Sequence, residues 1–142
     1  MIVREMQLED IPQLSVLYRQ FWNEESDVVK MKKQFVKIRE ENTHILLSAI
    51  IENKLAGSVM GIVCEELYGD CKPFLVIENM IVDQTTRRAG VGRALLLELE
   101  KRAAERNCTQ MILVTEEDRL DACSFYESYG FQRNNRGYKK KL

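Results

Sequence analysis

The sequence predicts one mixed α/β domain in which helices and strands alternate along the chain. Its 142 residues are enough for one domain and few for two of ordinary size. Segments whose apolar residues recur every three or four positions alternate with short runs rich in Val, Ile and Leu. Two of these runs are joined by a short turn, which predicts a hairpin, so the sheet should be mixed rather than fully parallel. We therefore expect a single domain over residues 1–142.

The N-terminal part is expected to form a short strand and two helices. Residues 1–6 predict the strand. Residues 8–22 predict the first helix, because apolar side chains follow helical spacing there: Ile11, Leu14, Leu17, Tyr18 and Phe21. Asp10 is expected to cap this helix, with Pro12 in its first turn. The second helix is expected from Val28 to about Glu41.

The later elements comprise three strands, a long helix and a closing α-β-β segment. Residues 44–52 and 58–68 predict the hairpin strands, and residues 74–83 predict the next strand. A helix is expected over Gly90–Arg106 and a strand over residues 109–115. A short helix then ends at Gly130, and strands at 131–134 and 137–142 close the chain. The predicted order is β-α-α-β-β-β-α-β-α-β-β.

The composition gives no sign of a nucleic-acid or membrane partner. The formal net charge is only −1, so no general field attracts the chain to a polyanion. The four cysteines form no C-x-x-C pair and the single histidine, His44, cannot complete a Cys/His zinc set, so we expect reduced thiols and no metal. The first residues carry acids where a signal peptide would be apolar, and no apolar run reaches about 18 residues. These features indicate a cytoplasmic protein.

Residues 85–103 place small and basic residues at the start of the long helix. Unpaired backbone N–H groups and a partial positive charge at a helix N-terminus bind phosphates readily. Gly90 and Gly92 keep Cβ atoms away from such an anion, and Arg87, Arg88 and Arg93 add positive charge. The alternative is a strand-to-helix turn that needs glycine, with solvated arginines.

Two common phosphate-binding motifs do not fit this stretch. A P-loop requires Lys followed by Ser or Thr after its last glycine, whereas Gly92 is followed by Arg93. A dinucleotide-binding turn requires a third glycine where Leu95 stands, and it follows the first strand of its unit rather than lying in mid-chain.

Glu78 and Asn79 interrupt the apolar strand over residues 74–83. A buried strand rarely carries a glutamate unless it is paired or faces a cleft. The functional interpretation is a carboxylate at the floor of a cleft, which accepts a proton directly or through a water. The structural alternative is a side chain that points to solvent. Because strand side chains alternate, Glu78 is expected to share a face with Met80 and Val82.

The stretch ACSFYESYGF, residues 122–131, combines core-forming aromatic residues with one tyrosine of interest. Phe125, Tyr129 and Phe131 suit a core. Tyr126 either joins them or presents its hydroxyl to a cleft as a proton donor. Cys123 has no visible histidine partner, so we interpret it as a core residue.

Taken together, these stretches resemble the GNAT superfamily of acyl-CoA-dependent N-acetyltransferases. That family carries a strand ending in a V-[DE]-like turn, then [RQ]-x-x-G-x-[GA] opening a helix, and further on A-x-x-[FL]-Y-x-x-x-G-F. Here the same features read MIVD, RRAGVG over residues 87–92, and ACSFY followed by Gly130 and Phe131. The resemblance covers nearly the whole chain, and its specific motifs lie in residues 78–131. It implies a mostly antiparallel central sheet flanked by helices.

The resemblance also implies where acetyl-CoA binds as co-substrate. In the family, amides that follow the first basic residue of the motif hold the coenzyme A pyrophosphate, and these positions are Arg88, Ala89, Gly90, Val91, Gly92 and Arg93. The edge of the preceding strand pairs with the pantetheine arm, at Met80, Ile81 and Val82. Arg119 stands where many members have an Asn that contacts this arm. This departure removes the amide side chain from that position, and Arg119 is expected to reach a phosphate or the adenine ribose instead.

The implied reaction moves the acetyl group directly from acetyl-CoA to a primary amine, with no metal. Tyr126 matches the tyrosine that protonates the leaving thiolate in many members. Glu78 is the candidate general base, through a water. Some members instead place a catalytic Glu on the strand after the long helix, where this chain has Val114.

In this fold the junction of the first two helices usually sets the acceptor. Here Phe21 and Trp22 stand beside Glu24, Glu25 and Asp27, which suits a cationic amine. The alternative is a solvated acidic loop with a buried Trp22. We expect a small amine or a peptide amino terminus as acceptor, and a homodimer is left open.

Two other functions are compatible with the same residues. A fold of this kind can bind acyl-CoA as a sensor without turnover, and a solvent-facing Glu78 with a buried Tyr126 would favour that function. A nucleotide-binding domain that uses the Gly/Arg turn is the second alternative.

Overall fold

The computed structural model describes residues 1–142, which divide into two units, Met1–Ile112 and Leu113–Leu142. The second contains α4 (Leu120–Tyr129). The first contains, in chain order, β1 (Ile2–Glu5), η1 (Leu8–Asp10), α1 (Ile11–Trp22), α2 (Val28–Glu41), β2 (His44–Ile51), β3 (Lys54–Cys64), β4 (Phe74–Val82), η2 (Gln84–Thr86), α3 (Val91–Glu105) and β5 (Met111–Ile112).

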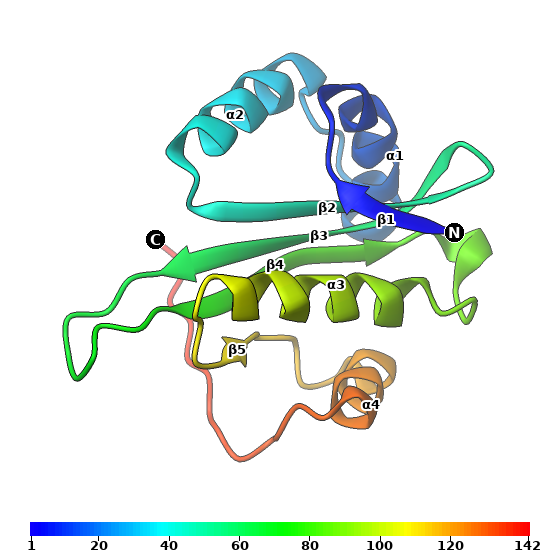
Figure 1. The fold of residues 1–142 in the computed structure, drawn as a ribbon. Helices are drawn as coiled ribbons and strands as arrows, with labels where there is room; N and C mark the ends of the chain where they lie inside the picture. Colours follow the sequence, from blue (N-terminus) through cyan, green and yellow to red (C-terminus); the bar gives the residue numbers. More distant parts are fainter. The chain divides into compact units, whose positions relative to one another are not determined.

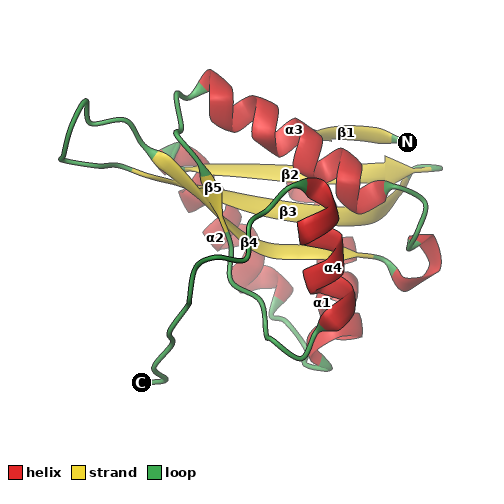
Figure 2. Cartoon of the chain, turned by 90° about the horizontal axis from the view of Figure 1, so that it is seen from below, coloured by secondary structure: helices red, strands yellow, loops and turns green.

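The first unit is built on one five-stranded sheet with the strand order β1-β2-β3-β4-β5 (Figure 2). Neighbours from β1 to β4 pair antiparallel, and β5 pairs with β4 in parallel. The prediction of a mixed, mostly antiparallel sheet flanked by helices is therefore confirmed. The hairpin is the β2–β3 pair, whose turn lies at Glu52 and Asn53, both with positive φ.

Helices cover both faces of this sheet, with α1 and α2 on one side and α3 on the other (Figure 1). The helix α1 packs on the sheet through its apolar stripe, because the apolar residues at helical spacing are buried there. The resulting cluster contains Met6, Ile11, Leu14, Leu17, Phe35, Leu55 and Ile81.

The α3 layer packs very closely on β3. Leu95, Leu96 and Leu99 of α3 are completely buried. A Cβ atom at Gly57 of β3 would lie 2.9 Å from Val91 Cγ1, and one at Gly61 would lie 2.8 Å from Leu99 Cδ1. Both positions must therefore lack a side chain, and the two glycines allow α3 to pack directly against the backbone of β3.

The two N-terminal helices lie where the sequence predicts them, but their caps differ. Asp27 caps α2 by accepting a hydrogen bond of 3.0 Å from Lys30 N. Asp10 precedes α1 without capping it, which corrects our expectation. Its carboxylate instead accepts two bonds from Arg4, at 2.7 and 2.8 Å, and one of 2.9 Å from Ser48 Oγ. A buried carboxylate is better satisfied by a guanidinium than by one helix amide.

The C-terminal strands were predicted wrongly. Residues 131–142 form no helix or strand, and β5 has only two residues where we expected a strand over 109–115. The final segment is rich in Asn and Lys, which have low strand propensity, and residues 132–142 are exposed. The helix ending at Gly130 is confirmed, since α4 ends at Tyr129 and Gly130 has φ of 122°.

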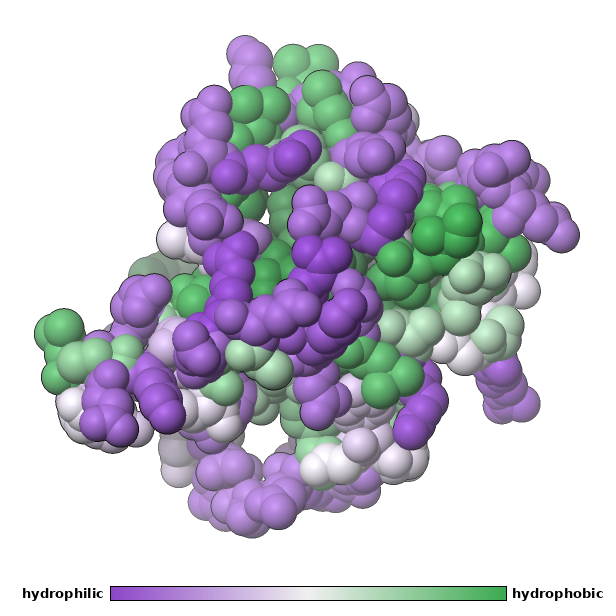
Figure 3. All heavy atoms as spheres, viewed as in Figure 1, coloured by the Kyte–Doolittle hydropathy of each residue, from purple (hydrophilic) through white to green (hydrophobic).

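On the side where α3 lies in front, polar residues cross the middle of the surface and hydrophobic areas lie between and beside them (Figure 3). Apolar atoms are also exposed at the N-terminus of β1, where Met1 is 59% and Ile2 65% exposed. No helix combines the length and the apolar character that crossing a membrane would require.

Candidate functional site

A β-bulge interrupts β4 at the position that carries the polar residues. Ser58 of β3 pairs with Ile81, and Met60 pairs with Glu78, so β4 has one residue more than β3 over this stretch. Asn79 lies in the bulge and has φ of 49°, in the left-handed region that asparagine tolerates better than most residues. The polar middle of the strand therefore marks a change in backbone geometry.

The bulge changes the face on which Glu78 lies. Residues directly opposite each other in an antiparallel pair point to the same face, and Ser58 and Met60 share one face of β3. Glu78 therefore lies on the same face as Ile81, which packs against α1 and α2. The expectation that Glu78 shares a face with Met80 and Val82 is wrong, because one extra residue reverses the alternation. The side chain is exposed to solvent.

The edge of β4 that faces β5 is paired only at its beginning. The parallel ladder contains two pairs, Leu75 with Met111 and Val76 with Ile112. Asp83 N donates to Ala56 O of β3 at 2.9 Å, so the carbonyl of Val82, in the same trans peptide unit, points away from β3. The segment from Ile77 to Val82 thus presents backbone groups to an edge that no strand of the sheet covers.

The connection from β4 to α3 is an exposed turn with two left-handed residues. Arg88 has φ of 66° and Gly90 has φ of 79°. The first bond within α3 runs from Ala94 N to Gly90 O at 3.0 Å, so the preceding amides lie at the helix N-terminus. Residues 87–90 and Arg93 are exposed, Gly92 is partly buried, and the side of Gly90 where a Cβ would stand is open.

Two residues that the sequence did not single out hold this turn. Asp83 accepts hydrogen bonds from Thr85 Oγ1 at 2.6 Å and Thr85 N at 2.7 Å. The bond from the Thr85 hydroxyl lowers the pKa of Asp83 against the opposing effect of burial. Gln20 of α1 contacts Asp83 at 3.4 Å and accepts from Gln84 N at 3.2 Å. The Val82-Asp83 pair that ends the MIVD stretch was a sequence signal for Asp83, whereas no sequence signal pointed to Gln20.

The α1–α2 junction exposes aromatic side chains. Trp22 is 47% and Phe21 37% exposed, and their ring centroids lie 4.6 Å apart. The alternative of a buried Trp22 is therefore wrong. Tyr18 packs on Trp22 from within the helix, 5.2 Å between centroids, and burial raises the pKa of its phenol to about 12.

Two of the three acidic side chains at this junction form hydrogen bonds with nearby residues. Asp27 caps α2, and Glu25 accepts a bond of 2.8 Å from Arg19 Nη1. Glu24 is exposed and makes no such bond. Of the predicted acidic group, Glu24 is therefore the carboxylate most available to a ligand.

The second unit carries Tyr126 and Arg119. Tyr126 lies in α4, where its ring contacts those of Phe125 and Phe131, with centroids 5.2 and 5.7 Å apart. Burial raises the pKa of its phenol, and the charge of Arg119 works in the opposite direction. Arg119 stands at the N-terminal boundary of α4.

Within the second unit, the chain end lies against residues 114–116. The Cβ position of Gly137 is 3.4 Å from Val114 Cγ2, and Lys139 forms an ion pair with Glu116. Val114 itself is 76% exposed. Cys123 is only partly buried, and its thiol lies 3.9 Å from Glu116 O.

All four cysteines are free thiols. No group of three or more His, Cys, Asp or Glu side chains gathers in an arrangement that would hold a metal ion.

The chain is similar to known acetyltransferases in sequence and in fold. The family model described as Acetyltransferase (GNAT) family matches residues 8–131. An uncharacterized protein, YdhI, of Bacillus subtilis (strain 168) is 30% identical over 78 residues, 54% of this chain and 45% of that protein. A glucosamine 6-phosphate N-acetyltransferase of Trypanosoma brucei brucei is 37% identical over 66 residues, 46% of this chain and 43% of that protein. The match thus spans less than half the length of either relative.

The fold is shared with solved structures over the full chain. A putative acetyltransferase from Agrobacterium tumefaciens str. C58 superposes with a TM-score of 0.93 at 22% identity and covers 100% of both chains. The family model covers most of the present sequence, including the strand, the Gly/Arg turn and the tyrosine motif. The chain therefore belongs to the acetyltransferase (GNAT) family.

Proposed function

We propose that the chain is an N-acetyltransferase that moves the acetyl group of acetyl-CoA to a primary amine. The observation that carries this proposal is the exposed turn before α3, where arginines, helix-terminal amides and the open side of Gly90 meet. The family match supports acetyl-CoA as the donor. Similarity to a glucosamine 6-phosphate N-acetyltransferase supports an amine as the acceptor.

The turn suits the pyrophosphate of the coenzyme for electrostatic reasons. The N-terminus of α3 carries a partial positive charge, and Arg88 and Arg93 add two full charges beside it. Ala89, Gly90, Val91 and Gly92 contribute the backbone that the anion approaches. The uncovered edge of β4 offers backbone groups of Met80, Ile81 and Val82 to an extended amide-containing arm. Arg119 is proposed to reach a phosphate or the ribose.

Glu78 is proposed to take a proton from the incoming ammonium group. Its exposure means that solvent reaches the carboxylate, which fits proton transfer through a water. It lies on the face that α1 covers further along β4, so the α1–α2 junction borders the same side of the sheet. When bound, acetyl-CoA supplies the thioester carbonyl that the neutral amine attacks.

The test of this base is Glu78→Gln, which keeps the shape of the side chain and removes its basicity. We expect kcat/KM to fall and the acidic limb of its pH profile to flatten, with the acetyl-CoA affinity unchanged. Glu65→Gln is the matched control, because Glu65 is also exposed and lies beyond the opposite end of β3. If the acidic limb persists in Glu78→Gln, another group or bulk water accepts the proton.

Tyr126 is proposed to protonate the leaving thiolate. A tyrosine phenol is protonated at neutral pH, and burial raises the pKa of Tyr126 further, so the hydroxyl is present as a donor. Tyr126→Phe removes only the hydroxyl and should lower kcat more than it raises KM, by about 10²–10⁴-fold where no water substitutes. An unchanged kcat, with chemistry shown to be rate-limiting, would contradict this role.

The acceptor is proposed to bind at the α1–α2 junction. Phe21 and Trp22 offer exposed ring faces and edges to an ammonium group, and Glu24 offers a carboxylate, while Glu25 would have to leave Arg19. A screen of polyamines, amino sugar phosphates and peptide amino termini with acetyl-CoA, read by release of free thiol, tests the acceptor class. Trp22→Ala should raise KM for the accepted amine and leave the acetyl-CoA affinity unchanged.

A sensor that binds acyl-CoA without turnover is the second candidate, and the exposed Glu78 is the observation that favours it. The same screen separates the two functions. Calorimetric binding of acetyl-CoA with no thiol release for any amine would support the sensor. Absence of acetyl-CoA binding would overturn both. The family match gives no support to a nucleotide-binding domain.

A further inference from the structure

Two glutamines join the last turn of α1 to the connection between β4 and α3. Gln84 N donates to Gln20 Oε1 at 3.2 Å, and Gln84 Nε2 donates to the Gln20 carbonyl oxygen at 3.4 Å. Gln20 Nε2 also donates to Asp83 Oδ2 at 3.4 Å. Each glutamine therefore uses both its side chain and its backbone to join two segments that lie far apart in the sequence.

This glutamine link acts on the backbone at the end of α1. The last four carbonyl groups of a helix lack intrahelical donors, and the carbonyl of Gln20 is one of them, because α1 ends at Trp22. Gln84 supplies the missing donor from outside the helix. Side chains two positions apart on a helix do not face each other, so Gln20 affects Trp22 through the helix turn to which both belong.

The other side of the link is continuous with the turn before α3. Thr86 N donates to Asp83 O at 3.0 Å, and Ala89 N donates to Thr86 O at 3.3 Å. Two consecutive hydrogen-bonded turns therefore follow Asp83, and Gln84 lies within the first of them. An anion that binds the amides at the start of α3 restrains these turns, and with them the position of Gln84.

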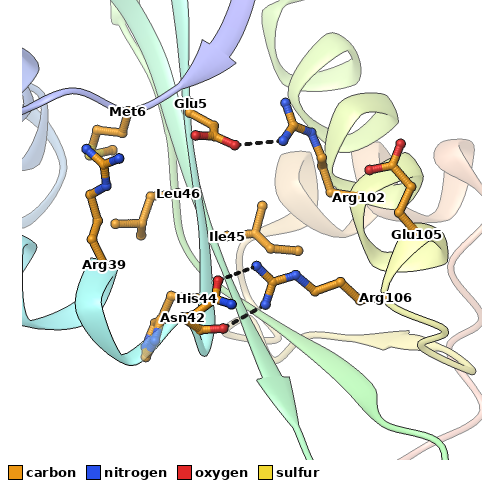
Figure 4. A pocket seen from close by; sticks show the side chains of 10 residues that line it. All are labelled: Glu5, Met6, Arg39, Asn42, His44, Ile45, Leu46, Arg102, Glu105 and Arg106. Atoms are coloured by element: carbon orange, nitrogen blue, oxygen red, sulfur yellow. Dashed lines mark hydrogen bonds and ion pairs between the residues drawn. The ribbon is translucent and has the colours of Figure 1, made fainter.

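The far end of α3 is anchored to its neighbours. Arg106 donates to Asn42 O at 2.7 Å and to Asn42 Oδ1 at 2.9 Å, which ties α3 to the end of α2 (Figure 4). Arg102 forms an ion pair of 2.8 Å with Glu5 of β1 (Figure 4). Because α3 is held in this way, a ligand at its N-terminus is expected to act on the exposed turn before the helix rather than to move the helix.

We propose that Gln20 is a positioning residue, through which an anion bound at the turn before α3 fixes the aromatic end of α1. The inference rests on the proposed function, since it takes the coenzyme pyrophosphate to bind at that turn and the acceptor to bind at the α1–α2 junction. The restrained Gln84 holds the last turn of α1, so Phe21 and Trp22 are kept in one arrangement. Binding at one site then lowers the entropy cost of binding at the other, and the effect is reciprocal.

The experiment uses the fluorescence of Trp22, which is the single tryptophan of the chain and is 47% exposed at the end of α1. Inorganic pyrophosphate is the first probe, because it has neither a pantetheine arm nor an acetyl group that could reach the junction directly. Acetyl-CoA is the second probe. We expect the emission of Trp22 to change saturably with each probe, with midpoints that agree with the Kd values from calorimetry.

Variants of two glutamines in α1 separate positioning from stability. Gln20→Met keeps the length of the side chain and removes its hydrogen bonds. It should raise the Kd for acetyl-CoA about 2- to 10-fold, the usual effect of losing a neutral hydrogen bond, and should abolish most of the change in Trp22 emission. Gln13→Met is the matched control, because Gln13 accepts from Leu55 N of β3 at 2.8 Å and so joins α1 to the sheet instead of the turn. It should lower stability and keep the Trp22 response.

Gln84→Met tests the link from its other side. It removes only the bond from Gln84 Nε2 to the Gln20 carbonyl and should reduce the Trp22 response in part. Because Gln84 is exposed, this variant decides the question if Gln20→Met does not fold.

Three outcomes would overturn the positioning role alone. They are binding without a change in Trp22 emission in the wild type, a full response in both Gln20→Met and Gln84→Met, and an equal loss of response in Gln13→Met. If neither pyrophosphate nor acetyl-CoA binds, the coenzyme site of the proposed function is wrong, and the positioning role falls with it.

Discussion

Two connections between a strand and a helix use similar parts for different purposes. Residues 6–10 join β1 to α1, and residues 83–90 join β4 to α3. Each contains a short 3-10 turn and an aspartate that accepts several hydrogen bonds. They differ in where the partners of the aspartate come from.

In the first connection the aspartate ties distant segments together. Asp10 is 5% exposed and bonds to Arg4 of β1, to the Gln7 amide and to Ser48 of β2. Burial alone would raise the pKa of Asp10, but these hydrogen bonds outweigh it, so the pKa lies below its usual range. The Asp10 carboxylate is therefore occupied by hydrogen bonds within the protein, and this connection leaves it unavailable to a ligand.

In the second connection the aspartate holds mainly its own turn. Asp83 bonds twice to Thr85, and the residues that follow expose two positive φ angles and a row of arginines. An aspartate that links two strands, such as Asp10, contributes mainly to the stability of the fold. An aspartate that shapes a turn beside exposed basic residues, such as Asp83, is more typical of a binding surface. The comparison predicts that mutations in the two connections have separable effects.

The largest effect is expected from Gly92→Val in the second connection. A branched side chain beside the first amides of α3 should keep the pyrophosphate away from them. Losing two hydrogen bonds to a charged group costs about 3 kcal/mol or more, or about 100-fold in Kd. Calorimetry with acetyl-CoA measures this, and circular dichroism should show a folded protein. Unchanged affinity in that folded variant would remove the pyrophosphate from this turn.

The next effect is expected from Asp10→Asn in the first connection. Removing one partner of a buried ion pair leaves the other without compensation, and the side chain of Arg4 is still 31% exposed, so solvent relieves part of the cost. We expect a loss of about 2–3 kcal/mol in the free energy of unfolding by urea denaturation. Asp83→Asn, in the exposed turn, should lose less. The acetyl-CoA affinity should survive Asp10→Asn, and a large fall in it would show that the two connections are coupled.

The stability contributed by Asp10 should also depend on pH in one direction. Its pKa is lower in the folded chain than in the unfolded chain, so the unfolded state takes up the proton first as the pH falls. The contribution is complete above the unfolded pKa, about 4, and disappears as the pH falls through the folded pKa. The stability difference between the wild type and Asp10→Asn should therefore narrow below about pH 4. A difference that stays constant down to acid unfolding would mean that the ion pair contributes little.

The contrast between local and distant partners also explains which features the sequence could predict. Helix spacing located α1 and α2, and the Gly/Arg stretch located the turn before α3, because these signals are local. The bulge at Asn79 was missed, since an asparagine in a strand signals a left-handed residue only once the pairing with β3 is known. This single residue moved Glu78 to the other face. The role of Asp10 was missed because its partners lie in β1 and β2.

The C-terminal segment failed for a different reason. The expectation of two closing strands, over residues 131–134 and 137–142, gave too little weight to Asn134, Asn135 and the run of lysines, which favour no strand.

The smallest effect concerns Gly90, where the comparison can be sharpened with a matched control. Gly90 and Gly69 both have positive φ, 79° and 59°, and both would place a Cβ in open space. Alanine at either position should cost about 1 kcal/mol of stability through backbone strain alone. If the turn before α3 binds the coenzyme, Gly90→Ala should in addition raise the Kd for acetyl-CoA severalfold, because the new methyl group occupies space beside the helix amides. Gly69→Ala lies in the β3–β4 loop and should leave that Kd unchanged. Equal stability losses with no difference in Kd would mean that Gly90 serves only the turn, and the pyrophosphate contact would then fall to Gly92 and the amides after it.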